Sequence, residues 1–268
     1  MPVATAQSFQ SLRASPLPDL PCWVEPRILL KGSLMILSGP AAIGKTFLML
    51  EAADNLSRGR PLWGVFPVPR PVRVLLIEQE VGIYGIQERL QAKYKNQEAP
   101  PDAWVVTKDP EIGVDDPSGF ERLRGLVEKV DPGVLILDPA TRFLVLGDES
   151  DNTAIARFYR QLDRLLVARP DLAIILTHHF GKDPKEPPQG WDDLNLDQGR
   201  GASKWRDGPD LRVMVRCRDR VGGRPARWDT HWVPRHAPEM RLSFYMGNDF
   251  RITGVSPSGV EVPVFGAE

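Results

Sequence analysis

The sequence predicts an α/β fold with a mostly parallel central sheet flanked by helices. Short runs rich in leucine and β-branched residues recur along the chain with helical stretches between them, and this spacing indicates β-α-β units. The early runs are apolar without alternation, which is typical of strands buried on both faces of a parallel sheet. Residues 211–268 alternate more and contain turn pairs such as Gly222-Gly223, which predicts antiparallel strands near the C-terminus.

The expected elements alternate regularly along the chain. The predicted strands are residues 34–38, 72–78, 103–106, 134–138, 173–177 and 211–217. The helices between them are predicted at residues 45–58, 83–95, 118–130 and 151–168. The last helix follows Ser150, Asp151 and Asn152, any of which can cap its first turn, and its apolar residues recur at helical spacing. One face of this helix is therefore expected to pack on the sheet.

We expect a flexible N-terminal segment over residues 1–20 and a single domain over residues 21–268. A chain of 268 residues is long enough to build one large core. Residues 181–199 are polar and rich in proline, and they are long for a loop in a compact domain. We therefore predict a mobile loop in that range.

The composition excludes several classes of protein. With 42% hydrophobic residues and a net charge of -1, the chain has the profile of a folded protein and not of a disordered or fibrous one. No apolar run approaches the roughly 20 residues that span a bilayer, and the N-terminus lacks a signal sequence, so we expect a cytoplasmic protein with no membrane partner. Cys22 and Cys217 form no Cys-x-x-Cys pair, which indicates neither a disulfide framework nor a structural zinc site.

Residues 39–46 read Gly-Pro-Ala-Ala-Ile-Gly-Lys-Thr and match the P-loop pattern G-x-x-x-x-G-K-[ST]. The pattern lies directly after a predicted strand and before an apolar predicted helix, which is the context that it requires. Its glycines permit turns that direct backbone N–H groups inward, and Lys45 adds a full charge near the β- and γ-phosphates. The expected nucleotide-binding residues are Gly39, Pro40, Ala41, Ala42, Ile43, Gly44, Lys45, Thr46 and Phe47.

A P-loop also needs a carboxylate that orients the hydration shell of Mg²⁺. Asp138 ends the predicted strand 134–138, where an unpaired buried carboxylate would otherwise be costly. The hydroxyl of Thr46 is expected to bind the same ion. The sequence therefore predicts a magnesium site formed by Thr46 and Asp138.

Hydrolysis further requires a group that positions or deprotonates water near the γ-phosphate. The predicted strand 72–78 ends in Glu78, and Glu80 follows on the same side but beyond the carboxyl end of the sheet. We expect Glu80 to be the catalytic carboxylate. Glu78 is expected to pair with a basic neighbour such as Arg73 or Arg89.

The order of these parts resembles the RecA-like ATPases, specifically the AAA_25 group typified by the RepA-type hexameric replicative helicases of plasmids. After the P-loop come the strand with Glu80, then Asp138, then a strand ending in Leu-Thr-His178-His179, and then Arg200-Gly-Ala-Ser. The resemblance extends over residues 20–220.

This resemblance implies a RecA-like P-loop NTPase fold, ATP and Mg²⁺ as ligands, and a homo-oligomer in the form of a hexameric ring. It implies catalytic roles for Lys45 and Glu80 and a γ-phosphate sensor at His179. At Arg200 it implies an arginine finger that reaches the ATP of a neighbouring subunit, with Lys204 and Arg206 as alternatives. A finger supplied in trans would make hydrolysis depend on assembly.

The C-terminal part of the chain carries local positive charge. Residues 200–241 contain 11 Lys and Arg against 5 Asp and Glu. Alternation along residues 211–218 places Arg212, Arg216 and Arg218 on one outward face, which could bind the phosphates of single-stranded DNA. A solvated arginine face, salt bridges between subunits and contacts to a neighbour's ATP remain alternatives.

Two further features bear on nucleic-acid binding and point in opposite directions. Trp205, Trp228 and Trp232 lie near the arginines in sequence and are candidates for stacking on bases. The loop 181–199, by contrast, is acidic overall, which disfavours contacts with phosphates.

The sequence leaves two main functions open. The first is an ATP-hydrolysing motor coupled to single-stranded DNA, as a helicase, a translocase or a replication accessory ATPase. The second is an ATP-dependent assembly switch that acts on a protein partner without moving along DNA. A small-molecule kinase shares the P-loop, but the Arg-Gly-Ala-Ser segment after the His-His strand fits the RecA-like pattern better.

Overall fold

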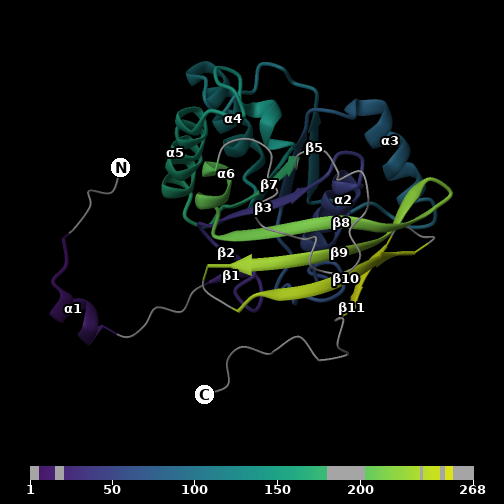
Figure 1. Cartoon of the computed structure of the whole chain (residues 1–268), viewed down its shortest axis with the longest axis horizontal. Helices are drawn as coiled ribbons and strands as arrows, with labels where there is room; N and C mark the ends of the chain where they lie inside the picture. Colours follow the sequence, from purple (N-terminus) through teal and green to yellow (C-terminus); the bar gives the residue numbers. More distant parts are fainter. Residues whose placement is uncertain (1–5, 16–20, 180–202, 236–237, 248–250, 256–268) are drawn as a thin grey trace.

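The computed structural model describes residues 6–15, 21–179, 203–235, 238–247 and 251–255. Within these ranges, nine strands form one sheet in the order β11-β10-β9-β8-β3-β7-β6-β4-β5, and β1 and β2 form a separate antiparallel pair (Figure 1). The strands are β1 (Cys22–Val24), β2 (Leu29–Leu30), β3 (Leu34–Gly39), β4 (Val74–Glu78), β5 (Ala103–Thr107), β6 (Val134–Asp138), β7 (Ala173–His179), β8 (Leu211–Val221), β9 (Arg224–Pro234), β10 (Met240–Met246) and β11 (Ile252–Val255).

Helices separate the parallel strands. They are α1 (Phe9–Ala14), α2 (Lys45–Arg58), α3 (Gly82–Lys93), α4 (Pro117–Val130), the 3-10 turn η1 (Ala140–Phe143), α5 (Asn152–Ala168) and α6 (Lys204–Asp207). The side chain of Asp151 caps α5 by accepting a hydrogen bond from the N–H of Thr153. Helix α1 was not predicted, and none of its residues is buried. Throughout the described ranges, no helix has both the length and the apolar character needed to cross a membrane.

The predicted fold class is confirmed. Strands β8, β3, β7, β6, β4 and β5 run parallel to one another, whereas β9, β10 and β11 are added antiparallel beside β8 at one end of the sheet. The predicted elements agree with the observed ones to within about two residues, except that β8 continues to Val221 and forms a long hairpin with β9. The predicted mobile loop 181–199 lies outside the described residues.

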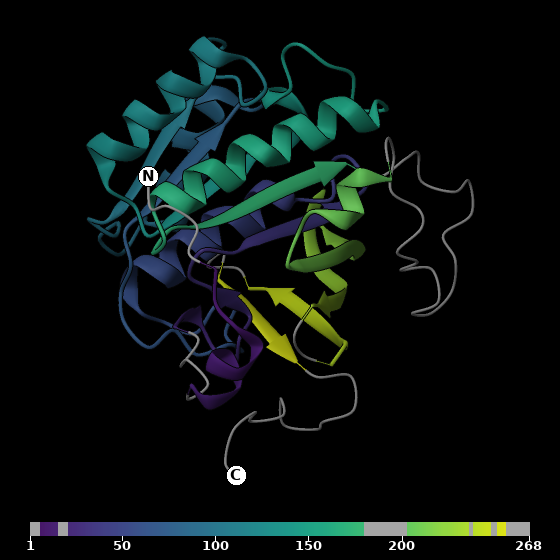
Figure 2. The same cartoon turned by 90° about the vertical axis from the view of Figure 1, so that its left-hand side faces the viewer.

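The sheet separates two hydrophobic cores. In β4, for example, Val74 and Leu76 face the core beneath α2 and α3, whereas Leu75 and Ile77 face the core beneath α4 and α5. Figure 2 shows α4 and α5 lying across one face of the sheet. The central strands are covered on both faces, which explains why their sequences are apolar without alternation.

The run 103–106 was expected to form a strand that is buried on both faces of the sheet, and this expectation is wrong. Strand β5 is at the end of the sheet, with β4 as its neighbour. The side chains of Trp104 and Val105 are 52% and 37% exposed. An apolar run at an edge strand therefore has the same sequence appearance as a central one, and only the strand order distinguishes them.

The three tryptophans considered for base stacking are core residues, so that expectation is wrong. Trp205, Trp228 and Trp232 are no more than 3% exposed. Trp232 packs against Trp63 and Phe66, with ring centroids 5.6 and 4.8 Å apart. These tryptophans stabilise the packing of β9 and α6, and their faces are not available to a base.

Candidate functional site

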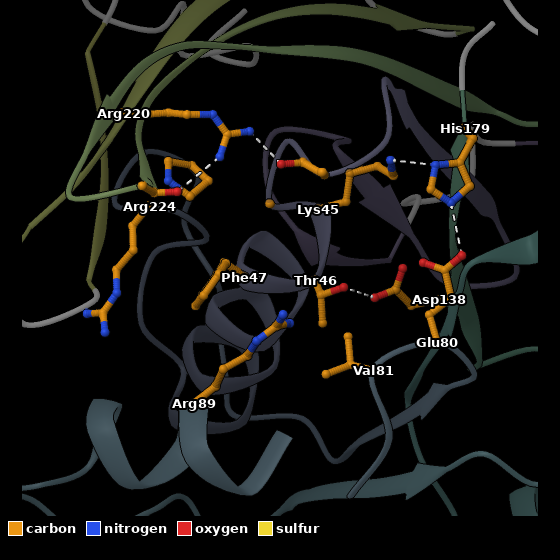
Figure 3. A pocket seen from close by; sticks show the side chains of 14 residues that line it. Lys45, Thr46, Phe47, Glu80, Val81, Arg89, Asp138, His179, Arg220 and Arg224 are labelled. Carbon is orange, nitrogen blue, oxygen red and sulfur yellow. Dashed lines mark hydrogen bonds and ion pairs between the residues drawn. The ribbon is translucent and has the colours of Figure 1, made fainter. Parts of the chain in front are cut away.

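The carboxyl ends of four parallel strands meet at one edge of the sheet. Gly39 at the end of β3 pairs with His179 at the end of β7, and Glu78 at the end of β4 pairs with Asp138 at the end of β6. A cavity of about 310 Å³ lies at this edge, bounded by the start of α2, by α3 and by the β8–β9 hairpin (Figure 3). The parallel topology thus brings together segments that are far apart in sequence.

The P-loop forms one wall of this cavity. Gly44 (φ 91°) occupies the left-handed region that glycine adopts readily, and Ala42 (φ 59°) occupies the same region despite its side chain. Helix α2 begins at Lys45, so its N-terminal amides and the positive end of its dipole are at the cavity. Ala42, Gly44, Lys45, Thr46 and Phe47 line the cavity, whereas Gly39, Pro40, Ala41 and Ile43 of the predicted set are not among its lining residues.

Lys45 is buried and held in place by three contacts. Its ammonium group donates to the backbone carbonyls of Gly39 and Pro40, at 3.0 and 2.7 Å, and lies 3.1 Å from Nδ1 of His179. Burial lowers the pKa of Lys45 to about 8, although the carboxylates of Asp138 and Glu80 oppose this shift. A desolvated cation of this kind gains much from a nearby anion, because little water competes for it.

Thr46 and Asp138 form the predicted pair for a magnesium ion. The Thr46 hydroxyl donates to Oδ2 of Asp138 at 2.7 Å, and Thr177 donates to the other carboxylate oxygen. Burial raises the pKa of Asp138, and the hydrogen bonds from the two threonines act in the opposite direction. The described residues contain no cluster of three or more His, Cys, Asp and Glu that could hold a metal. The hydroxyl and carboxylate oxygens of Thr46 and Asp138 fit Mg²⁺, which is usually bound by one or two protein ligands together with water and phosphate.

Glu80 and His179 lie together next to Lys45, on the same side as Asp138 (Figure 3). Nε2 of His179 is 3.3 Å from Oε1 of Glu80, and Nε of Arg142 is 3.9 Å from the same oxygen. Because the ammonium group of Lys45 can only donate, Nδ1 of His179 accepts from it, and Nε2 is the ring nitrogen whose N–H donates a hydrogen bond to Glu80. The hydrogen bond from His179 is the main cause that lowers the pKa of Glu80. Glu80 is therefore a carboxylate at neutral pH.

Glu78 has a different environment, and in the described structure it does not form the expected direct ion pair with Arg73 or Arg89, although its charge opposes the lowering of the pKa of Arg89 by burial. Its carboxylate accepts backbone N–H groups of Glu80, Val81 and Gly82 at 2.5 to 2.8 Å, at the start of α3. Arg73 instead pairs with Asp102 at 2.9 Å. Glu78 is fully buried and does not line the cavity, whereas Glu80 does.

Arg89 is a cavity residue that the sequence analysis did not assign to the site. Its guanidinium lies 4.6 Å from the ring centre of Phe47, and its buried Nη1 atom has no hydrogen-bond partner in the described structure. Burial lowers the pKa of Arg89. A buried donor without an acceptor is unfavourable, and a phosphate oxygen in the cavity would supply the acceptor. Val81, at the N-cap of α3, and Arg89, about two helical turns later, both line the cavity, and this spacing could have indicated a place for Arg89 there.

The β8–β9 hairpin supplies the remaining wall, which the sequence analysis also missed. Arg220, Gly223, Arg224 and Pro225 line the cavity, and Figure 3 shows Arg220 and Arg224 on the side where Phe47 lies. Nη2 of Arg220 donates to the carbonyl oxygen of Ala42 at 2.5 Å. No local sequence signal marks these residues, because the contact joins positions 178 residues apart.

The other residues that the sequence singled out lie elsewhere. Arg200 is outside the described residues, and its alternatives Lys204 and Arg206 are on α6 and do not line the cavity. The expected outward face of β8 is also corrected. Arg216 is 6% exposed, and Arg218 binds Asp229 at 2.8 Å. Arg212 is partly exposed, so the three arginines do not form one continuous exposed surface.

His178 has no place in the cavity although it precedes His179. It is 1% exposed, its ring lies 4.7 Å from that of Trp205, and burial lowers its pKa to about 3. In the unfolded chain its pKa would be near 6.5. Since the folded pKa is depressed, the stability that neutral His178 contributes is fully present above about pH 6.5 and is lost as the pH falls toward 3.

We therefore expect wild-type stability to fall more steeply with acid than that of His178→Gln. Between pH 6 and pH 4.5, the free energy of unfolding should fall by up to about 1.4 kcal/mol more per pH unit in the wild type, because the unfolded state alone takes up this proton. Urea unfolding curves at pH 7, 6 and 5 would measure the two slopes. Parallel slopes would mean that His178 titrates normally in the folded protein.

This fold and site define a P-loop ATPase with a RecA-like fold. The family model described as AAA domain, AAA_25, matches residues 4–185. The chain belongs to this family, since the match covers more than half of its 268 residues.

The solved structures include one titled ATPase Domain of G40P that is similar to this chain. The TM-score is 0.61 at 12% sequence identity, over 84% of this chain and 86% of that chain. At this identity the likeness shows the fold, and it confirms the RecA-like architecture expected from the sequence. No protein among the curated ones matches this chain.

Proposed function

We propose that this chain is an ATP-hydrolysing motor that forms a homo-oligomeric ring, of hexameric size, and couples hydrolysis to single-stranded DNA as a helicase, translocase or replication accessory ATPase. One observation carries the ATPase part of the proposal. Lys45, Thr46, Asp138 and Glu80 line a single cavity, and the orphaned donor of Arg89 lies at the same cavity. These are the groups that phosphoryl transfer to water requires.

In the proposed complex, the P-loop amides and Lys45 bind the β- and γ-phosphates. Thr46 and Asp138 hold Mg²⁺, which when bound neutralises charge on the phosphate oxygens. Arg89 donates its free N–H to a phosphate oxygen and remains stacked on Phe47. Each of these contacts adds positive charge or donors to a partly buried site, where they act more strongly than in water.

Glu80 positions the attacking water and accepts its proton. Its ionised state at neutral pH fits this role, and the hydrogen bond from His179 fixes its orientation. His179 contacts both Lys45 and Glu80, at 3.1 and 3.3 Å, so its ring links the phosphate-binding group to the water-positioning group. This position suits a sensor of the γ-phosphate.

Arg200 is proposed as the finger that completes the site of a neighbouring subunit, with Lys204 and Arg206 as alternatives. Such a residue stabilises the charge of the transition state and typically contributes about 10³ to 10⁵ in rate. Hydrolysis would then require assembly.

One observation favours the alternative function, an ATP-dependent assembly switch that acts on a protein partner. The surface considered for DNA is interrupted, because Arg216 and the tryptophans are buried. A face without a continuous row of exposed cations offers fewer phosphate contacts. The alternative predicts ATP-dependent assembly with slow turnover and no response to DNA.

Steady-state ATPase measurements with and without single-stranded DNA distinguish the two functions. For the motor, we expect turnover to rise severalfold with excess oligonucleotide, and we expect the apparent affinity for DNA to fall steeply with salt because counterions are released on binding. The mass of the assembly should be measured on the same sample with a non-hydrolysable ATP analogue, and the Lys45→Ala variant should control for contaminating ATPases.

The outcomes separate clearly. Unchanged turnover in an assembled sample would remove the DNA-coupled motor and leave the switch. A mass that stays at 30.0 kDa with the analogue would remove the ring. Absence of nucleotide binding would remove both functions.

A further inference from the structure

Two consecutive carbonyl groups of the P-loop are held by side chains of the β8–β9 hairpin. Arg220 on β8 donates to the carbonyl oxygen of Ala42 at 2.5 Å, and Nε1 of Trp228 on β9 donates to the carbonyl oxygen of Ile43 at 2.6 Å. The hairpin and the P-loop also pack tightly. A Cβ atom on Gly44 would lie 2.7 Å from the ring of Pro225, and one on Gly39 would lie 2.4 Å from the carbonyl oxygen of Val215.

These two contacts fix the orientation of two peptide planes. In a trans peptide, the carbonyl of one residue and the N–H of the next point in opposite directions. Arg220 holds the carbonyl of Ala42, so the N–H of Ile43 in the same peptide plane points away from Arg220. Trp228 holds the carbonyl of Ile43, so the N–H of Gly44 points away from Trp228. Among the described residues, neither N–H donates to an acceptor of the protein. Both are thus oriented donors without a partner.

The P-loop needs this external support. Ala42 is held at φ 59°, a conformation that strains a residue with a side chain, and such a residue stays there only when its surroundings impose it. Trp228 is well suited to impose it, since it is fully buried and its ring cannot move without disturbing the core. Arg220 is exposed, so its hydrogen bond competes with water and is expected to be the weaker of the two.

We propose that Arg220 and Trp228 are positioning residues for nucleotide binding: the β8–β9 hairpin presets the amides of Ile43 and Gly44 for the phosphates. The inference deepens the proposed function and rests on nucleotide binding at the P-loop. It also gives the antiparallel strands a role in the site, since their hairpin determines how the phosphate-binding loop is shaped. Trp228 does not line the cavity, so its effect on a ligand must pass through the P-loop.

Trp228→Phe tests the proposal with little change in shape, because it keeps a buried aromatic ring and removes the N–H donor. Trp232→Phe is the matched control. Trp232 is equally buried on the same strand, and its indole donates to Oγ1 of Thr230 at 2.8 Å instead of to the P-loop. Affinity for MgADP, measured by isothermal titration calorimetry, and KM and kcat for MgATP should be determined for the wild type and both variants.

We expect Trp228→Phe to weaken MgADP binding and raise KM by about tenfold. The P-loop of the free variant is less ordered, and ordering it when the nucleotide binds costs free energy. The kcat at saturation should stay within about threefold of wild type, since bound phosphates restore the loop. Trp232→Phe should bind MgADP as the wild type does, even if both variants lose similar thermal stability. Arg220→Ala should raise KM by a smaller factor, and Arg220→Lys should restore part of the loss.

The result has a clear interpretation in each case. Equal MgADP affinity in Trp228→Phe, Arg220→Ala and Trp232→Phe would overturn the inference while leaving the proposed function intact. A similar loss of affinity in Trp228→Phe and Trp232→Phe would overturn it as well, because the effect would then be a general one of the core. Failure of the wild type to bind MgADP would overturn the proposed function and this inference with it. If Trp228→Phe does not fold, Arg220→Ala still tests the inference, because MgADP affinity equal to that of the wild type would overturn it.

Discussion

Replacing Lys45 with alanine should abolish nucleotide binding at micromolar concentrations and lower kcat/KM by roughly 10² to 10³, the effect seen when one preorganised donor to a developing charge is removed. The reason is the position of the ammonium group. It is buried beside the P-loop carbonyls, and burial lowers its pKa to about 8. Because little water competes for this cation, a bound phosphate is attracted to it strongly. Equilibrium binding of MgADP and initial ATPase rates would measure the loss.

Measuring the thermal stability of Lys45→Ala and of the wild type, with and without MgADP, separates a loss of binding from a loss of folding. Without nucleotide, Lys45→Ala should be as stable as the wild type or more stable, since the variant no longer buries a poorly solvated cation. With MgADP at 100 times its wild-type Kd, the wild type should gain about 2.7 kcal/mol and the variant almost nothing. An undiminished ligand-induced shift in the variant would show that the phosphates bind away from this lysine.

The P-loop and the two acids were predictable because their signals are local. A strand, eight residues of fixed type and a helix define the phosphate site, and in a parallel sheet every strand ends at the same edge. Asp138 and Glu80 could be placed near Thr46 by this rule alone. The 2.7 Å hydrogen bond between Thr46 and Asp138 is the direct consequence.

The residues that the sequence did not reveal reach the site from distant elements. Trp228 contacts Ile43 across 185 positions, and Arg220 contacts Ala42 across 178. Arginines and tryptophans also lie near one another in this part of the sequence, as they do in proteins that bind nucleic acid, and this explains the wrong expectation for the tryptophans. Trp228 and Trp232 are buried because their face of β9 packs in the same core as Ile43 and α2, and side-chain alternation within one strand does not determine which face is covered.

For the two glutamates at the end of β4, the sequence pattern likewise did not reveal every contact, even between residues close together in the chain. The position beyond the strand end correctly favoured Glu80 over Glu78 for the cavity, which Glu80 lines and Glu78 does not. The partner of Glu78 was wrong, because a carboxylate at a helix N-terminus can be satisfied entirely by backbone amides. Its three N–H donors come from the first residues around α3, so no arginine is needed.

Replacing Glu80 with glutamine should leave nucleotide binding nearly unchanged and slow hydrolysis by about 10² to 10⁴, the range that general-base groups contribute. Glutamine has almost the same shape and can keep a hydrogen bond to His179, but it cannot accept a proton from water. MgADP affinity by calorimetry and single-turnover hydrolysis of ATP would separate binding from chemistry. An unchanged single-turnover rate would shift the role away from Glu80.

Glu78→Gln is the matched control, since it makes the same chemical change two residues away. Glu78 accepts three backbone amides and its own side chain does not line the cavity, so the variant should lose about 1 to 2 kcal/mol of stability from the start of α3, while kcat stays within a few-fold of wild type. The expected losses are thus opposite: Glu80→Gln should lose hydrolysis rate, and Glu78→Gln should lose stability. If Glu78→Gln lost the rate and Glu80→Gln only the stability, the catalytic carboxylate would be the buried one, and α3 would have to move before hydrolysis could occur.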